Sequence, residues 1–245
     1  MIYFAVMVPK YDLEKIKFGV DSPTFQKAIG LYDRGCVTQF KDQFGGYSAV
    51  VIGGSPYQVF VSNKDFNAGD CTCYLGVNDT LCKHMVALAM HAIKNGEILT
   101  EDDRIQRNVL VFSGRAGELT GLKLSKFKED VTEALRYIKP YMGPSRIWFI
   151  YQNSLDEGCN RLSALLSELP ASSQTAGLVV SLLLRIDKKL TQGGVDDSNG
   201  TVGGFIEEAV KLLLEFAKIA PECKKEFEKL KGVDTCFDWE DPLIS

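Results

Sequence analysis

Four residues that commonly bind metals lie close together in the first half of the chain. They follow the order Cys-x-Cys, eight residues, Cys-x-His, and are Cys71, Cys73, Cys82 and His84. Three thiolates and one imidazole form a complete tetrahedral set for Zn²⁺ and leave no position for a reacting water molecule. Closed sets of this kind are structural. The cluster therefore predicts one zinc ion that holds a small fold together.

The spacing within each pair predicts the path of the backbone. Two sulfur atoms on one tetrahedral zinc ion lie about 3.8 Å apart, whereas alternate residues of a flat strand stand about 6.6 Å apart. The chain must therefore bend at Thr72. Cys82 and His84 would point to different faces of a regular helix, so we expect them where a helix begins. Apolar residues follow at helical spacing until Gly96, namely Met85, Leu88, Ala89, Ala92 and Ile93.

The segment before the cluster predicts a short helix and an antiparallel sheet. Ser22 offers an N-cap with Pro23 at the first helical position, and Gly35 can end that helix. A buried strand is predicted at residues 2–8, followed by a polar connection at 10–20. Three further strands are predicted between glycine-containing turns, at residues 36–40, 46–52 and 57–61.

Taken together, the helix, the small sheet, the four ligands and the apolar helix resemble the SWIM-type zinc finger. The resemblance covers about residues 22–96, and the stretch from Ala28 to Val37 is similar to the helix and strand that introduce that finger. It implies that Cys71, Cys73, Cys82 and His84 bind Zn²⁺. The family is generally regarded as a nucleic-acid or protein interaction module. DNA binding is disfavoured here, because few basic residues flank the finger, namely Lys64, Lys83 and Lys94.

Composition and charge exclude several other classes of protein. The chain has 245 residues, of which 45% are hydrophobic and 24% charged, as in an ordinary globular protein. Its formal charge of −4 disfavours a protein that binds nucleic acids or other polyanions through its overall charge. Seven cysteines with no export signal indicate metal binding or free thiols rather than a disulfide framework. The apolar run at 2–8 is too short for a membrane span, so we expect a cytoplasmic protein with no membrane partner.

Beyond the finger the pattern becomes helical, which predicts an α+β protein of two domains. We expect a module at residues 1–107, with the finger at about 57–96 and a polar connector at 97–107, and a helical domain at 108–245. Ser154 and Glu157 form a potential capping box. The predicted helices run over residues 125–138, 154–169, 172–190, 202–219 and 221–230.

Other candidate residues favour a structural interpretation. The glycine-rich loop Gly193–Gly204 fails as an EF-hand, since Val195 and Ile206 occupy its end ligand positions, and lacks the Gly-Lys-Ser/Thr of a phosphate loop. We expect a flexible connection there, with the following helix capped by Ser198, Asn199 or Thr201. Trp148–Tyr151 are expected in a core rather than as a stacking platform for bases. His91 lies about 10 Å along the helix from His84, too far for the same ion. The remaining cysteines are expected as small core residues, namely Cys36, Cys159, Cys223 and Cys236.

These observations favour a non-catalytic protein that binds another protein. The first alternative is a nucleic-acid-binding protein, which a clustered basic face would support. The second is an enzyme of unknown chemistry that uses Asp196 and Asp197, which a deep polar pocket would support. A Cys159 nucleophile lacks a histidine base, because His84 is a predicted ligand and His91 lies in the other part of the chain.

Overall fold

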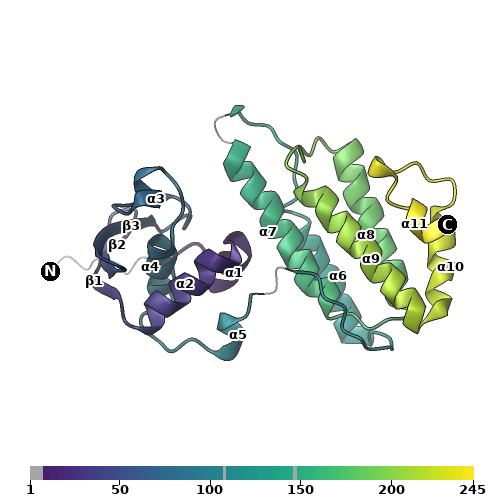
Figure 1. Cartoon of the computed structure of the whole chain (residues 1–245), viewed down its shortest axis with the longest axis horizontal. Coiled ribbons are helices and arrows are strands. Elements are labelled where there is room, and N and C mark those ends of the chain that lie inside the picture. The colour runs from purple at the N-terminus through teal and green to yellow at the C-terminus, as the bar shows by residue number, and fades with distance from the viewer. Residues whose placement is uncertain (1–7, 107–108, 146–147) are drawn as a thin grey trace. The chain divides into compact units, whose positions relative to one another are not determined.

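The computed structural model describes residues 8–106, 109–145 and 148–245. The chain divides into two compact units, residues 1–106 and residues 107–245. The first contains a small antiparallel sheet with helices, and the second is helical, as the α+β prediction requires (Figure 1). Of the strand predicted at 2–8, all but Val8 lies outside the described residues.

The first helix, α1 (Leu13–Gly19), occupies the segment predicted as a polar connection. That prediction is wrong because the segment carries its own cap and its own apolar face. Asp12 accepts a hydrogen bond from the backbone N–H of Lys15 at 2.7 Å, and Leu13 and Ile16 are buried. The apolar positions are too few to stand out as a helical period in the sequence.

The second helix, α2 (Ser22–Asp33), begins one residue earlier than predicted, at the residue expected to be its cap. Asp21 is the N-cap and accepts from the backbone N–H of Thr24 at 2.9 Å, so Ser22 is already helical. Gly35 follows the helix with a positive φ of 63°, the left-handed conformation that glycine adopts most readily. The helix therefore ends where the glycine predicts.

The described residues of this unit contain four strands, which form one sheet in the order β1-β2-β3-β4 with antiparallel neighbours throughout. The sequence predicted the first three but not the last, which is too short to show an alternating pattern. Its pairing with β3 places Cys71 opposite Val59. The strands are β1 (Val37–Gln43), β2 (Gly46–Ile52), β3 (Pro56–Ser62) and β4 (Gly69–Cys71).

Helix α4 (Lys83–Lys94) packs against α2 and against one face of β2 and β3. The core of this unit lies between them and includes the fully buried Phe25, Val51, Val61 and Leu88. Before α4 the chain forms a four-residue helix, α3 (Tyr74–Val77), which the sequence did not predict. Figure 1 shows α3 beside the sheet and α4 across it.

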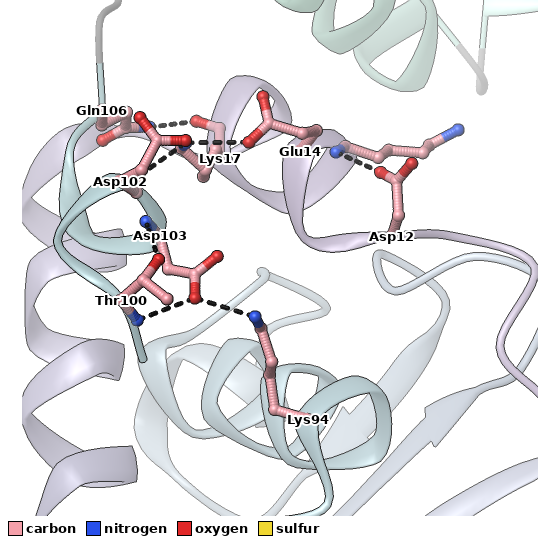
Figure 2. A network of polar contacts seen from close by, with 9 residues as sticks. Asp12, Glu14, Lys17, Lys94, Thr100, Asp102, Asp103 and Gln106 are labelled. Carbon is pink, nitrogen blue, oxygen red and sulfur yellow. Dashed lines mark hydrogen bonds and ion pairs between the residues drawn. The ribbon is translucent and has the colours of Figure 1, made fainter. Parts of the chain in front are cut away.

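The segment predicted as a connector belongs to the first unit. It contains the short helix α5 (Glu101–Arg104), whose N-cap Thr100 forms a capping box with Asp103. Asp103 also accepts from the ammonium of Lys94 at 2.8 Å (Figure 2). Arg104 pairs with both carboxylate oxygens of Asp33, its guanidinium nitrogens lying 2.5 and 3.0 Å from them.

A buried lysine holds the same segment to α1. The ammonium of Lys17 donates to Glu14 at 2.8 Å and to the carbonyl of Asp102 at 2.9 Å. The amide of Gln106 in turn donates to the carbonyl of Lys17 (Figure 2). Residues 97–106 are therefore part of this unit rather than a free linker. The side chains of Asp103 and Arg104 pair with α4 and α2, and the segment also forms hydrogen bonds with Lys17 of α1.

In the part of the second unit that the structure describes, there are four long helices and a series of short ones. Its core is apolar and includes Leu162 of α7, Leu183 of α8 and Leu213 of α9, all fully buried. Helix α7 packs against α6 and α9, and α8 packs against α9 and the short helix α10 (Lys224–Phe227). The long helices are α6 (Gly121–Ala134), α7 (Trp148–Ser167), α8 (Ser173–Thr191) and α9 (Thr201–Ile219).

The predicted start of α7 is wrong. Ser154 and Glu157 do not form a capping box, because both lie within a helix that already includes Trp148. The hydroxyl of Ser154 instead donates to the carbonyl of Tyr137 at 2.9 Å, and Glu157 pairs with Arg161 at 2.9 Å. Apolar residues before the apparent cap extend the helix at its N-terminal end.

The final part of the chain is a set of short turns that pack on α8 and α9. The segment predicted as one helix at 221–230 is divided into η2 (Pro221–Cys223), α10 (Lys224–Phe227) and η3 (Glu228–Leu230). After these come η4 (Cys236–Asp238) and α11 (Asp241–Ile244). The buried Asp187 of α8 accepts from the backbone N–H of Cys236 at 2.7 Å and from the indole of Trp239 at 3.1 Å, and so fixes this segment.

In the part of the chain that the structure describes, none of the helices has the length and apolar character needed to span a membrane.

Candidate metal centre

The four predicted ligands come from three elements that meet at one end of the sheet. Cys71 is the last residue of β4, and Cys73 is the N-cap of α3. Cys82 is the N-cap of α4, and His84 lies in its first turn. The chain turns between the first two ligands at Thr72, whose hydroxyl accepts from the backbone N–H of Gln58 at 3.0 Å. The bend and the helix start predicted from spacing are both present.

The ligand atoms lie as one tetrahedral metal site requires. All four lie within 4.8 Å of one another. Nδ1 of His84 is 3.7 Å from Sγ of Cys71 and 3.7 Å from Sγ of Cys82, and a sulfur and a nitrogen on one tetrahedral zinc ion lie about 3.6 Å apart. Each of the four residues is buried, with at most 6% of its surface exposed.

The imidazole of His84 is oriented by residues outside the ligand set. Its ring packs on Tyr57 of β3, with the ring centroids 4.5 Å apart. Nε2 faces the turn between β2 and β3, where a Cβ atom on Gly53 would lie 2.5 Å from it. This arrangement directs Nδ1 toward the thiols, and among the described residues Nε2 has no hydrogen-bond partner.

The backbone of α3 supports the second ligand. The N–H of Gly76 donates to Sγ of Cys73 at 3.4 Å. Gly76 itself packs against Cys71, so closely that a Cβ atom would lie 2.2 Å from the carbonyl oxygen of Cys71. The short helix therefore supplies one backbone donor to the ligand Cys73 and packs against the end of β4, where the ligand Cys71 lies.

The protonation equilibria of the four groups suit metal binding. Burial raises the pKa values of the Cys71 and Cys82 thiols. Burial also acts to raise the pKa of Cys73, but the backbone N–H of Gly76 and the two other thiols outweigh it and lower that pKa. Burial lowers the pKa of His84 to about 4. The imidazole is therefore neutral at pH 7, the form that binds a metal, and zinc uptake must release thiol protons.

The donor set also identifies the kind of metal. Three sulfurs and one nitrogen in a tetrahedral arrangement suit zinc, whereas Mg²⁺ and Ca²⁺ prefer oxygen ligands. With four protein ligands and almost no solvent access, the site fits Zn²⁺ as a structural ion, which would join β4, α3 and α4.

A comparison with family models agrees with this geometry. The model of the SWIM zinc finger matches residues 57–93. This chain carries a SWIM zinc finger. The matched SWIM residues run from β3 to near the end of α4 and include all four ligands. No curated protein and no solved structure matches the chain.

The SWIM finger leaves His91 outside the metal site. His91 is half-buried, with its ring centroid 4.9 Å from that of Phe40 and 6.1 Å from that of Tyr32. Burial lowers its pKa. It therefore contributes to packing between α4, β1 and α2, which agrees with the predicted exclusion from the ion.

The glycine-rich loop of the helical unit is held in place, contrary to the prediction of a flexible connection. Asp196 accepts from the indole of Trp148 at 3.1 Å, and its backbone N–H donates to the hydroxyl of Tyr151 at 2.9 Å. Asp197 accepts from the backbone N–H groups of Val202 and Gly203, each at 2.8 Å. None of the three predicted residues is the N-cap of α9, which is Gly200. Asn199 nevertheless accepts from the backbone N–H of Thr201 at 3.3 Å, while Asp197 accepts from the next two.

The remaining sequence candidates lie in structural positions. Of the four residues 148–151 expected in a core, Tyr151 is buried and Trp148 is half-buried, with its indole donating to Asp196. The side chains of Phe149 and Ile150 lie outside the described part of the chain. Cys159 and Cys223 are buried, while Cys36 and Cys236 are only half-buried. Gly53 and Gly76 were missed as site residues, because a glycine between two strands or within a loop resembles any turn glycine when one sequence is read alone.

Proposed function

We propose that this chain is a non-catalytic protein that binds another protein. In this proposal zinc fixes the sheet to α4, and the helical unit supplies most of the surface for the partner. The observation that carries the proposal is the closed Cys₃His set, because four buried protein ligands leave no position at the metal for a substrate or a reacting water molecule.

The charges around the finger support a protein partner over a nucleic acid. Lys94, one of the few basic residues near the ligands, is already paired with Asp103. The formal charge of the chain is −4, and binding to DNA depends on neutralising phosphates. Three apolar side chains project from α3 beside the site, with exposed fractions of 84% for Tyr74, 43% for Leu75 and 72% for Val77. Exposed apolar groups of this kind are typical of protein contacts.

The acidic loop gives little support to an enzyme. Asp196 and Asp197 accept hydrogen bonds from the loop, from α7 and from the start of α9. These contacts explain why both carboxylates are present without assigning them a reaction. A catalytic role would need a group that remains available to a substrate.

We also place the protein in the cytoplasm. None of the seven cysteines forms a disulfide, which fits a reducing compartment.

The experiment is the recovery of partners from the native cell with the zinc-loaded chain as bait. Nuclease treatment of the extract separates partners that bind the protein from those that bind through nucleic acid. We expect a defined protein partner that survives nuclease and is lost from the Cys73→Ser variant. Binding of duplex DNA at physiological salt with an affinity tighter than about 1 μM would favour the nucleic-acid alternative instead.

A further inference from the structure

A groove in the helical unit lies between α9 and the C-terminal segment. Its volume is about 740 Å³. One wall is the face of α9 that carries Gly203, Glu207 and Leu214, and the other wall runs from Phe237 to Pro242. Both walls belong to the same unit. Asp187 of the neighbouring helix α8 accepts hydrogen bonds from Cys236 and Trp239 and so anchors the C-terminal wall, and α11 packs on α9. The groove is therefore a fixed feature of this unit.

The lining of the groove is mainly apolar. Ile206 and Val210 of α9 and Trp239 of the C-terminal segment form its floor and are almost completely buried. Phe237 stands at the rim with 69% of its surface exposed, although it is a large apolar side chain. A concave apolar surface with an exposed aromatic residue at its edge is typical of a binding site.

The charges at the groove are predominantly negative. Three carboxylates, those of Asp197, Glu207 and Asp238, line it together with one ammonium, that of Lys211. Asp197 is engaged with the first backbone N–H groups of α9. Among the residues that the structure describes, Glu207 and Asp238 are in no ion pair, and both are exposed. The groove therefore offers unpaired negative charge beside an apolar floor.

The length of the groove decides the class of ligand. From Gly203 to Leu214 it follows α9 for roughly 16 Å, or about three helical turns. An open channel that follows a helix for three turns can accept the apolar face of an amphipathic helix laid along it. We propose that the groove binds an amphipathic helix of a partner protein, with its apolar side chains on the floor and lysine or arginine residues opposite Glu207 and Asp238.

This inference rests on the proposed function, because it names the surface and the partner chemistry of the same interaction. The two are tested separately. The recovery of a partner from cells does not depend on the groove, and the experiment below uses defined peptides rather than a cell extract.

The first test blocks the groove. Gly204 lines it, is exposed, and has no heavy atom within 4 Å of the position that a Cβ atom would take. Gly204→Trp therefore fills the groove without a clash in the helix, and Gly204→Ala is the matched control that leaves it open. Unchanged zinc content and thermal melting confirm that each variant is folded.

The probe is a synthetic 12-residue helical peptide of leucine and lysine, compared with its leucine and glutamate counterpart by calorimetry on the full zinc-loaded chain. We expect the lysine peptide to bind at least about tenfold tighter than the glutamate peptide. Gly204→Trp should lower the affinity for the lysine peptide at least about tenfold, and Gly204→Ala should lower it less than about twofold. Equal binding to Gly204→Trp, or no binding of the lysine peptide, overturns the proposal.

The second test reverses one charge. Glu207→Lys changes a groove carboxylate, and Glu208→Lys makes the same change at the next residue, which is exposed and does not line the groove. We expect the affinity for the lysine peptide to fall about fivefold in Glu207→Lys and less than about twofold in Glu208→Lys. Equal effects of the two variants overturn the proposal. So does binding of decylamine as tight as that of the peptide, because it would show a site for small amphiphiles.

Results with peptides and with cells are read together. If Gly204→Trp still recovers the cellular partner and the peptide does not bind, the groove proposal fails and the proposed function stands. If the peptide binds as expected but no protein partner is recovered, the proposed function fails.

Discussion

A Cβ atom on Gly53 would lie 2.5 Å from Nε2 of His84. The space for the metal-binding imidazole is therefore created in the turn between β2 and β3, at a residue that precedes the matched SWIM segment. Tyr57 closes the same space from β3, with its ring 4.5 Å from that of His84. The orientation of this ligand thus depends on the sheet as well as on α4.

The first prediction follows from this contact. Gly53→Ala should push the imidazole away from the thiols and weaken zinc binding by roughly 10-fold to 100-fold, the range seen when residues that orient metal ligands are altered. A competition titration with a chromophoric chelator measures this change. The control is Gly54→Ala, since a Cβ atom at Gly54 would meet no heavy atom within 4 Å. Equal zinc affinity of both variants would contradict the assigned role of Gly53.

A second prediction concerns the contact between α3 and β4. Gly76→Ala forces a methyl group against the carbonyl of Cys71, at a distance of 2.2 Å that the backbone must relieve. We expect the free energy of unfolding of the finger to fall by about 1–3 kcal/mol, as for other overpacked sites. Val77→Ala, at the exposed next residue of α3, should have almost no effect. Chemical denaturation of the zinc-loaded chain distinguishes these results.

A third prediction concerns the loop before α9. Asp197→Ala removes the acceptor for the N–H groups of Val202 and Gly203. The free energy of unfolding of the helical unit should fall by about 1 kcal/mol, as for the loss of a helix cap. Asp234→Ala changes an exposed carboxylate elsewhere and should leave that free energy unchanged. A flexible connection, the interpretation that the sequence favours, predicts no difference between the two variants in thermal melting.

A fourth prediction concerns pH. Burial acts to raise the pKa of Asp103, but the hydrogen bonds from Lys94 and Thr100 outweigh it and hold that pKa below its ordinary value. Because the folded pKa is depressed, the stabilisation by Asp103 is complete above the unfolded pKa of about 4 and is lost as the pH falls through the folded value. The difference in free energy of unfolding between the wild type and Asp103→Asn should therefore be largest at neutral pH and should shrink as the pH falls below about 4.

Carboxyl carbon titration by NMR tests the origin of that depression. We expect a pKa for Asp103 below its ordinary value in the wild type and a higher one in Lys94→Met. The same pKa in both chains would show that the ion pair has no influence on Asp103.

The metal site was predictable because its chemistry is local in the sequence. Two ligand pairs, each with one residue between, require a bend at Thr72 and a helix that begins at Cys82, and both are present. The residues that support the ligands were not predictable. Gly53 acts through a contact with His84, 31 residues away, and Gly76 through a contact with the backbone of Cys71. The sequence of a turn glycine does not show which atoms it will meet in the fold.

The helical unit shows the same limit. The periodicity of apolar residues located the long helices. Ser154 and Glu157 have the spacing of a capping box, but both lie inside α7. The glycines of the loop after α8 suggested mobility, whereas Trp148 and Tyr151 of α7 hold Asp196 by hydrogen bonds. Likewise, the charges at 97–106 suggested a solvated connector, yet Lys17 and Lys94 pair with this segment. In the last two cases partners distant in sequence decided the outcome.

The central claim is that Cys71, Cys73, Cys82 and His84 hold one structural zinc ion. Elemental analysis of the purified chain tests it most directly, with Cys73→Ser and His84→Ala as ligand variants and Cys159→Ser, a buried cysteine of the other unit, as the control. We predict one zinc per chain in the wild type and in the control. The ligand variants should lose the metal and the amide-exchange protection of residues 57–96, since zinc contributes on the order of 10 kcal/mol to such folds. A wild-type chain without zinc, or ligand variants that retain zinc in full, would contradict the claim.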